Sequence, residues 1–161
     1  MPAYKIREIL EADASWIYEA CQDEQVQYWT TVPRPYLLEP AQSFVRVEFP
    51  EYKIWAIEDE ESKPVGIISI HEVDESGMAD LGYFVAKWGR GKGAGKSAIE
   101  LVEQYAKTVP IIKSLAACIS DLNTHSQRIA EAAGLKKSEV AKRTCPAGDT
   151  QTAASIYRKS F

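Results

Sequence analysis

The chain has few cysteines and no long apolar run, and each absence excludes a class of protein. Its three cysteines, Cys21, Cys118 and Cys145, are widely spaced and form no Cys-x-x-Cys pair. An odd number at such spacing argues against a disulfide framework and against a zinc site, so no metal is expected. No apolar stretch approaches the length of a membrane span, about 18 residues or more. Charges interrupt residues 1–10, unlike the apolar core of a secretion signal, so we expect a cytoplasmic protein that binds no membrane.

Internal repeats, low-complexity tracts and an excess of positive charge are also missing. The formal net charge is −4 over 161 residues, of which 45% are hydrophobic and 26% are charged. Nucleic-acid binding depends on clustered Lys and Arg, so this balance argues against a nucleic acid as partner. Because no linker-like segment interrupts the chain, we expect one domain over residues 1–161, long enough to bury a core.

Hydrophobic periodicity predicts an α+β (α/β) fold with a mixed central β-sheet flanked by helices. Alternating or continuous apolar residues predict strands over residues 4–9, 54–58, 65–73, 79–85, 114–119, 137–143 and 152–161. Helical spacing predicts helices over residues 13–22, 40–47, 94–106 and 123–133. Two prolines within residues 28–36 predict a loop there.

A glycine-rich loop joins the predicted strand over residues 79–85 to the predicted helix over residues 94–106. Four glycines lie within the seven residues from Gly89 to Gly95. Unpaired backbone N–H groups at the start of a helix bind anions, because they lie at the positive end of the helix dipole. Arg90 and Lys92 add positive charge. The loop therefore predicts a binding site for a cofactor that carries a pyrophosphate.

Two of the glycine loops that bind such cofactors fit this sequence only in part. The segment Gly95–Ser97 matches the end of a nucleotide P-loop, but Arg90 occupies the position that requires the first glycine. Gly91 and Gly93 match the start of a dinucleotide-binding fingerprint, but Lys96 occupies its third glycine position. Both patterns fail because the phosphate site depends on the backbone geometry that these glycines permit.

A third pattern, Arg/Gln-x-x-Gly-x-Gly/Ala after a strand, is matched in full by Arg90, Gly93 and Gly95. This pattern is the acyl-CoA loop of the GNAT N-acetyltransferase superfamily, and the chain resembles that family. The order of the predicted elements, with about half of the chain before the glycine loop, is similar to that of the same fold. The resemblance implies a GNAT-type acyl-CoA N-acyltransferase fold, with acetyl-CoA as the cofactor and an amine as the acceptor.

Three further segments resemble one branch of the family, the ribosomal-protein N-terminal acetyltransferases of the RimJ/RimL type. They are Leu81–Val85, Val26–Val45, and Asn123–Ser126 followed by Gly134 and Leu135. Leu135 stands where this branch more often has Phe. The branch also contains enzymes that act on antibiotics and polyamines, so the acceptor stays open between a peptide N-terminus and a small molecule. The oligomeric state, including a homodimer, stays open as well.

The expected cofactor-binding residues fall into two groups. The backbone amides of the glycine loop are expected to hold the pyrophosphate; they belong to Arg90, Gly91, Lys92, Gly93, Ala94, Gly95 and Lys96. The resemblance implies that the strand edge at Phe84 and Val85 pairs with the pantetheine amides. Asn123 is expected either to contact the pantetheine arm or to cap the following helix, and the two roles are compatible.

Acetyl transfer from a thioester to an amine requires a neutral amine and a stabilised thiolate. The resemblance places the hydroxyl of Ser126 near the cofactor sulfur; the alternative is an ordinary Ser in a first helical turn. The resemblance implies an acid near the start of the predicted strand over residues 79–85, so Asp80 is one candidate base. His71, near the end of the predicted strand over residues 65–73, is the other. Histidine suits this role because the free imidazole titrates near neutral pH. A chain of water molecules in place of a base is the alternative.

The acceptor is expected to contact the loop over residues 28–36. Trp29, Pro33 and Tyr36 are the candidate acceptor-binding residues, because aromatic rings and prolines form a stiff apolar wall. Rings that only cover the core are the alternative. Two rival functions also stay open. One is a P-loop phosphotransferase with Ser120–Asp121 as the end of a Walker-B strand, and the other is a CoA-binding sensor without turnover.

Overall fold

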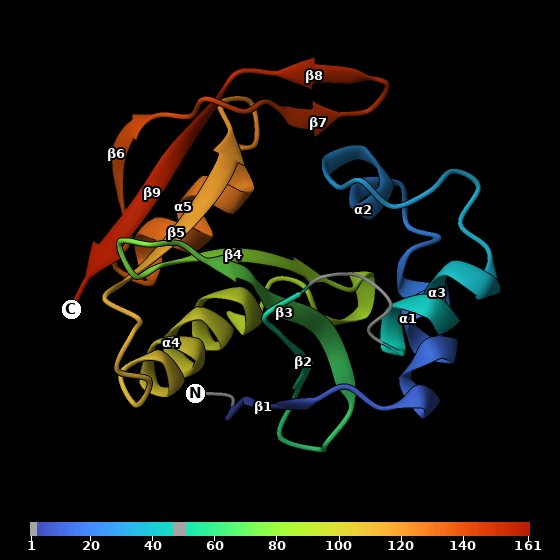
Figure 1. Ribbon diagram of the computed structural model, residues 1–161. Helices are drawn as coiled ribbons and strands as arrows, with labels where there is room; N and C mark the ends of the chain where they lie inside the picture. Colours follow the sequence, from blue (N-terminus) through green and yellow to red (C-terminus); the bar gives the residue numbers. More distant parts are fainter. Residues whose placement is uncertain (1–2, 47–50) are drawn as a thin grey trace.

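A computed structural model describes residues 3–46 and 51–161 and shows a mixed seven-stranded sheet with helices on both faces (Figure 1). The strand order is β1-β2-β3-β4-β5-β9-β6, and all neighbours are antiparallel except the parallel pair β4–β5. The strands of this sheet are β1 (Lys5–Glu8), β2 (Lys53–Glu58), β3 (Pro64–Val73), β4 (Met78–Val85), β5 (Ser114–Ser120), β6 (Lys136–Val140) and β9 (Ala154–Ser160). The predicted fold class is confirmed.

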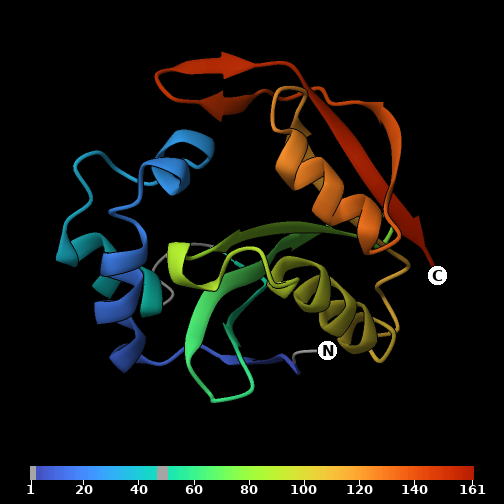
Figure 2. The same cartoon turned by 180° about the vertical axis from the view of Figure 1, so that it is seen from behind.

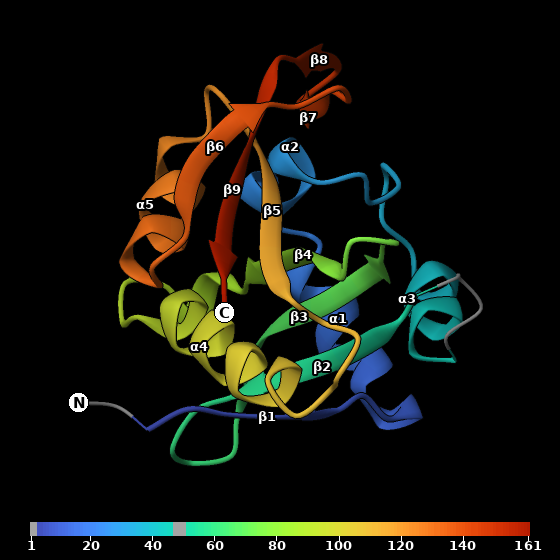
Figure 3. The ribbon, with the colours of Figure 1, turned by 60° about the vertical axis from the view of Figure 1, so that its left-hand side comes forward.

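The helices form two layers, one on each face of the sheet (Figures 2 and 3). The helices are α1 (Ala14–Ala20), α2 (Glu24–Trp29), α3 (Leu38–Val45), α4 (Ala94–Ala106) and α5 (Thr124–Ala132), with short 3-10 turns η1 (Glu11–Asp13) and η2 (Lys87–Gly89). One apolar core lies under α4 and α5, and a second lies between the sheet and the layer of α1 and α3. Burial of these apolar side chains is the main force that holds the layers to the sheet.

Helix α4 has the limits that its periodicity predicts. Ala94, Ala98, Ile99 and Val102 are buried on one face of this helix and belong to the core beneath it. A Cβ at Gly95 would lie 3.0 Å from the side chain of Ile129 on α5, so the glycine lets the two helices approach closely. The packing of α4 therefore fixes the direction in which its N-terminus points.

Strand β4 is paired to β5 along only half of its length. Met78–Leu81 pairs with Ser114–Ala117, and the register ends there. Among the described strands, none pairs with the β5 side of Gly82–Val85; we call this backbone the open edge of β4. Unpaired N–H and C=O groups on a strand edge are available to an extended ligand.

Some sequence-based limits are wrong by a few residues, and one hairpin is missed. Strand β6 ends at Val140 instead of residue 143, and a separate hairpin follows it, formed by β7 (Cys145–Ala147) and β8 (Thr150–Thr152). At its tip, the Gly148 N–H donates to the carbonyl of Tyr28 in α2 over 2.8 Å. The first two residues of the predicted loop are helical in α2. The predicted helix over residues 40–47 ends at Val45, and Val47 lies outside the described residues.

Within residues 3–46 and 51–161, the structure contains no helix with both the length and the apolar character needed to cross a membrane.

Candidate active site

The glycine loop reaches α4 through two residues with left-handed backbone. Gly91 has φ of 79° and Gly93 has φ of 86°, a region that residues with a Cβ rarely adopt. Gly93 is the N-cap of α4 and has no side chain with which to bond the N–H groups of the first turn. A Cβ placed on either glycine would meet no atom within 4 Å, so open space lies in front of the loop. These features fit a diphosphate bound to backbone amides.

Arg90 is anchored within the structure at the start of this loop. Its Nη2 donates to Asp23 Oδ2, and its Nε donates to the carbonyl oxygen of Val85 over 3.2 Å. Asp23 also caps α2 by accepting from the N–H of Val26. Burial alone would raise the pKa of Asp23, but Arg90 and the nearby N–H groups outweigh it and lower this pKa. Arg90 therefore ties the loop to α2, and its contact with a phosphate stays a prediction.

The other predicted cofactor residues can offer a cofactor their backbone groups rather than their side chains. Lys92 is exposed, its carbonyl accepts from the hydroxyl of Tyr4, and Lys96 pairs with Glu100 within α4. The side chains of Phe84 and Val85 pack toward opposite cores, so only their backbone lies on the open edge of β4. Ala94 and Gly95 are buried.

Ser126 lies in the first turn of α5 and contacts a tyrosine of β4. Its Oγ is 3.0 Å from the hydroxyl oxygen of Tyr83, which is also 3.2 Å from the Ser126 carbonyl oxygen. Burial raises the pKa of Tyr83 to about 12, although the hydrogen bond with Ser126 opposes this shift. The hydroxyl of Tyr83 is therefore protonated at neutral pH. Asn123 is the N-cap of α5, because its Oδ1 accepts from the N–H of Ser126 over 3.1 Å. The capping role expected for Asn123 is confirmed.

His71 is the extra residue of a β-bulge between β3 and β4. Ile70 pairs with Leu81 and Glu72 pairs with Asp80, so His71 has no partner in the ladder. Bulges redirect a side chain and often lie beside functional sites. The bulge therefore explains how a histidine at the end of a strand becomes directed toward the neighbouring strand.

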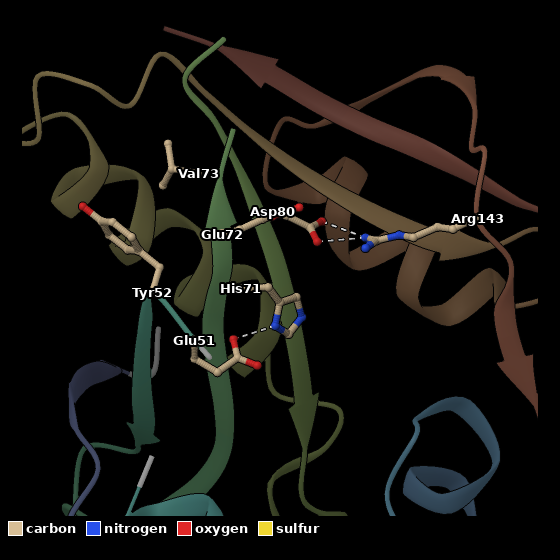
Figure 4. Close-up of a pocket in the computed structure, with 7 residues that line it drawn as sticks. All are labelled: Glu51, Tyr52, His71, Glu72, Val73, Asp80 and Arg143. Carbon is tan, nitrogen blue, oxygen red and sulfur yellow. Dashed lines mark hydrogen bonds and ion pairs between the residues drawn. The ribbon is translucent and has the colours of Figure 1, made fainter. Parts of the chain in front are cut away.

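The imidazole of His71 is held on two sides. Its Nδ1 lies 2.8 Å from Oε2 of Glu51, the residue two positions before β2 (Figure 4). A Cβ at Gly82 would lie 2.2 Å from the Nε2 of His71, so this ring occupies the space that a side chain at position 82 would fill. Gly82 is the first residue of the open edge of β4. The Nε2 atom of His71 therefore lies over the face of β4 at the residue where the open edge begins.

Asp80, the second predicted base, is already paired. Both of its carboxylate oxygens accept from Nη2 of Arg143 over 2.9 Å, and Asp80 is buried (Figure 4). Burial alone would lower the pKa of Arg143, but Cys118 and Asp80 outweigh it and raise this pKa. A permanent cation thus holds the Asp80 carboxylate, whereas the Nε2 of His71 lies over Gly82, where the open edge of β4 begins.

An open pocket of about 540 Å³ lies on the face of the sheet that carries His71. The side chains that line it are those of Glu51, Tyr52, His71, Glu72, Val73, Asp80 and Arg143 (Figure 4). The predicted acceptor residues Trp29, Pro33 and Tyr36 are not among them. Tyr36 is 5% exposed and belongs to the core beneath α1 and α3, so its ring supports the loop from inside. Trp29 is half-buried against Tyr28, and Pro33 is exposed.

The two candidate chemical groups lie on opposite faces of β4. Tyr83 packs on the core beneath α4 and α5, and it holds Ser126 there. Side chains alternate between faces along a strand, so Gly82 and the ring of His71 above it lie on the other face. The open edge of β4 runs between a hydroxyl on one face and an imidazole on the other. This arrangement can remove a proton on one side of a bound group and supply one on the other.

Three residues of the site were not singled out from the sequence. Tyr83 lies in the segment Leu81–Val85, whose resemblance to the family was its only signal. Glu51 precedes the predicted strand over residues 54–58 and Arg143 ends the predicted strand over residues 137–143, and each reaches the site only through the folded arrangement. No local pattern in the chain marks either of them.

Comparison with known proteins identifies the family. Residues 5–136, more than half of the chain, match the acetyltransferase (GNAT) domain. No curated protein sequence matches the chain.

Several solved structures share the fold. Mycobacterium smegmatis RimJ with CoA-disulfide has a TM-score of 0.84 at 16% identity, covering 98% of this chain and 81% of that chain. The microcin C7 self-immunity acetyltransferase MccE, with acetyl-CoA and AMP, has a TM-score of 0.83 at 17% identity, covering 98% and 92%. AAC(6')-Ib with paromomycin and acetyl-CoA has a TM-score of 0.80 at 16% identity, covering 98% and 93%. With its seven-stranded mixed sheet and the family match over residues 5–136, the chain belongs to the GNAT acetyltransferase family.

Proposed function

We propose that the protein is an acetyl-CoA-dependent N-acetyltransferase that moves an acetyl group to a primary amine by direct attack in a ternary complex. The observation that carries this proposal is the open edge of β4, which lies between the hydroxyl of Ser126 and the Nε2 of His71. One domain over residues 1–161 performs the reaction in the cytoplasm. The acceptor is a peptide N-terminus or a small-molecule amine, and the acetyltransferase acts alone or as a homodimer.

The binding site for CoA follows from the donors that the loop presents. The backbone N–H groups from Arg90 to Lys96 hold the diphosphate, because they lie at the positive end of α4. The open edge of β4 at Phe84 and Val85 pairs with the amides of the pantetheine arm. Bound acetyl-CoA supplies the thioester whose acetyl group is transferred. CoA compounds in the AAC(6')-Ib, MccE and RimJ structures support this choice of ligand.

The side chains of the site divide the proton transfers between the two faces of β4. His71 accepts the proton of the acceptor ammonium at Nε2, because this atom faces the open edge and an amine attacks only when neutral. Ser126 holds a hydroxyl proton on the face of α4 and α5, in position to stabilise a thiolate. Asp80 holds Arg143 at the wall of the pocket and is the alternative base.

The branch of the family is part of the proposal. The segments Leu81–Val85 and Asn123–Ser126 resemble the RimJ/RimL type, and the likeness of the fold to RimJ is consistent with that branch. Because the AAC(6')-Ib structure contains an aminoglycoside, the same fold also accommodates small amines. Peptide N-termini and polyamines are therefore both included as acceptors in the test.

Thermal unfolding with acetyl-CoA or with magnesium-ATP tests the cofactor before the acceptor is known. A ligand that binds only the folded state raises Tm by mass action, so acetyl-CoA is expected to raise it and magnesium-ATP is not. A rise with magnesium-ATP alone would point to the P-loop phosphotransferase instead.

Release of CoA thiol is then measured over a panel of peptides, polyamines and aminoglycosides. His71→Ala is expected to lower kcat by about a hundredfold, more than Asp80→Asn does, without changing the KM for acetyl-CoA. Tight binding of CoA without thiol release for any amine would contradict the proposal and favour a CoA-binding sensor. A larger loss of kcat in Asp80→Asn than in His71→Ala would assign the base to Asp80.

A further inference from the structure

Glu51 is brought to His71 by the hydrogen bonds of the β-bulge. The N–H of Tyr52 donates to two successive carbonyl groups of the bulge, those of Ile70 at 3.0 Å and of His71 at 3.2 Å. Tyr52 continues the register of β2 with β3, in which Lys53 pairs with Ile70, and this shared bond holds residues 51 and 52 alongside Ile70 and His71. Backbone hydrogen bonds therefore hold Glu51 and His71 next to each other, so their contact does not depend on side-chain conformation alone.

Glu51 also determines which nitrogen of His71 carries the proton. Its side chain is 18% exposed, and its Oε2 lies 2.8 Å from Nδ1 of the imidazole. An ionised carboxylate only accepts hydrogen bonds, so the Nδ1 of neutral His71 must be the donor. The Nε2 lone pair is then left on the edge of the ring that lies against Gly82. A base needs its lone pair on this side, because the open edge of β4 begins at Gly82.

We propose that Glu51 is a positioning residue for the acetyl transfer, because it fixes the orientation and the tautomer of His71. The inference rests on the proposed function, with His71 as the proton acceptor. When Nε2 takes a proton from the acceptor, the ring becomes a cation, and the negative charge of Glu51 stabilises it. Carboxylates that bond the distal nitrogen of a catalytic histidine act in this way in other enzymes.

The other charged or titratable groups around His71 do not take this role. The groups that face the pocket besides Glu51 are Tyr52, Glu72, Asp80 and Arg143. Asp80 and Arg143 bond each other, and Glu72 is exposed on the same strand as His71. Glu72 carries the same charge in the same pocket, and the described contacts of His71 do not include it. Glu72→Gln is therefore a matched control for the loss of one negative charge.

The tautomer of His71 can be measured without any acceptor. The chain has two histidines, so selective ¹⁵N labelling gives two imidazole signals, which His125→Asn assigns. At a pH where the imidazole is neutral, we expect ¹⁵N shifts that place the proton on Nδ1 of His71. Glu51→Leu should convert these shifts to those of a mixture of tautomers. Glu51→Gln should largely restore them, because the Gln carbonyl also accepts from Nδ1, and Glu72→Gln should leave them unchanged.

Kinetics separate positioning from a structural role. Glu51→Leu should lower kcat roughly 10- to 100-fold with an unchanged KM for acetyl-CoA, and Glu51→Gln should lower it less. Equal thermal unfolding of the variants and the parent shows that the fold is intact.

Each outcome of the NMR and kinetic experiments either supports or overturns the positioning role of Glu51. The proposal is overturned if Glu51→Leu leaves the tautomer of His71 as in the parent, or if Glu72→Gln changes it equally. It is also overturned if kcat is unaffected while the tautomer changes. If the parent acetylates no amine in the panel, the proposed function fails, and with it the catalytic role of Glu51. The NMR result then still shows whether Glu51 sets the tautomer, so the two failures are distinguished.

Discussion

The hydroxyl of Tyr83 on β4 lies 3.0 Å from Oγ of Ser126 on α5, across the space beside the open edge of β4. Because burial raises the pKa of Tyr83 to about 12, Tyr83 keeps its proton at neutral pH. When this proton is donated to Ser126 Oγ, the proton of Ser126 itself is left to point elsewhere. The pair can therefore orient a hydroxyl toward a sulfur that develops negative charge.

Ser126→Ala should lower turnover more than it weakens acetyl-CoA binding. The thiolate loses a hydrogen-bond donor that acts mainly in the transition state, so kcat should fall by about a hundredfold while the Kd for CoA changes little. Steady-state kinetics and calorimetric titration with CoA measure the two quantities. Intact turnover in this variant would make Ser126 a structural residue.

Tyr83→Phe tests whether the tyrosine acts through Ser126. The substitution removes only the hydroxyl, so we expect a smaller loss of kcat than in Ser126→Ala. In the double variant the two losses should not add, because both belong to one interaction. Additive losses would show that Tyr83 and Ser126 act separately.

Arg90→Ala should weaken CoA binding about tenfold, or about 1.4 kcal/mol, if the guanidinium contacts a phosphate of the cofactor. In the structure this guanidinium is bonded to Asp23, so a phosphate must compete with a carboxylate. Calorimetric titration with CoA at low and high salt measures the loss. An unchanged Kd would remove Arg90 from the cofactor site.

Asp23→Asn is the control for the anchoring role of Arg90. Asn keeps the N-cap of α2 but removes the negative charge that competes for the guanidinium. If Arg90 binds phosphate, CoA affinity should be unchanged or tighter in this variant. An equal loss of affinity in Asp23→Asn and Arg90→Ala would mean that Arg90 acts only by anchoring the loop.

Gly82→Ala should abolish the placement of His71 without unfolding the protein. The added Cβ would lie 2.2 Å from Nε2 of His71, and its three nearest atoms all belong to that imidazole. The ring is at the end of a flexible, partly exposed side chain, so it should swing away at a cost of about 1 kcal/mol or less. We expect kcat to fall to the level of His71→Ala while the Tm stays near that of the parent. Turnover at the parental level would exclude His71 as the base.

The sequence alone predicts the helices and strands whose apolar residues repeat with a single period. The apolar residues of α4 repeat at helical spacing from Ala94 to Ala106, and Lys107 after them is exposed. Both limits of this helix could therefore be predicted. The short hairpin β7–β8 has three residues in each strand and no clear alternation, so it was missed. Helix α2 was missed for a similar reason, because its six residues span less than two turns.

The sequence could name candidate site residues where the residue type itself suits the proposed reaction. The glycines, His71 and Ser126 could be named as candidates because backbone freedom, an imidazole and a hydroxyl suit the reaction. Their partners Glu51 and Arg143 could not be named from the sequence, because each contact forms only in the folded chain. Glu51 reaches His71 from the segment before β2, and Arg143 reaches Asp80 from the connection between β6 and β7. Tyr36, an aromatic ring in a proline-rich loop, belongs to the core, which is the alternative that the sequence left open for it.

Asp13 anchors the N-terminal segment to the sheet through four hydrogen bonds. It is 3% exposed, and its carboxylate accepts two bonds from Arg7 at 2.8 Å, one from the N–H of Leu10 at 2.7 Å and one from Nε1 of Trp16 at 2.7 Å. Burial alone would raise the pKa of Asp13, but the bonds from Arg7, Leu10 and Trp16 outweigh it and lower this pKa. Folding therefore favours the ionised form.

Asp13→Asn should reduce the free energy of unfolding by about 2–4 kcal/mol at pH 7, because it leaves the donors of Arg7 without a charged acceptor. Since the pKa is lower in the folded state, the stabilisation is complete above the unfolded value of about 3.9 and is lost as the pH falls through the folded pKa. The difference in the free energy of unfolding between parent and variant should therefore shrink below about pH 4, where the Asp13 carboxyl of the parent begins to take up a proton. Urea unfolding from pH 7 to pH 3 measures this difference, with Asp149→Asn as the control for an exposed carboxylate that pairs with Arg34. A difference that stays constant over this range would mean that the charge of Asp13 does not stabilise the fold.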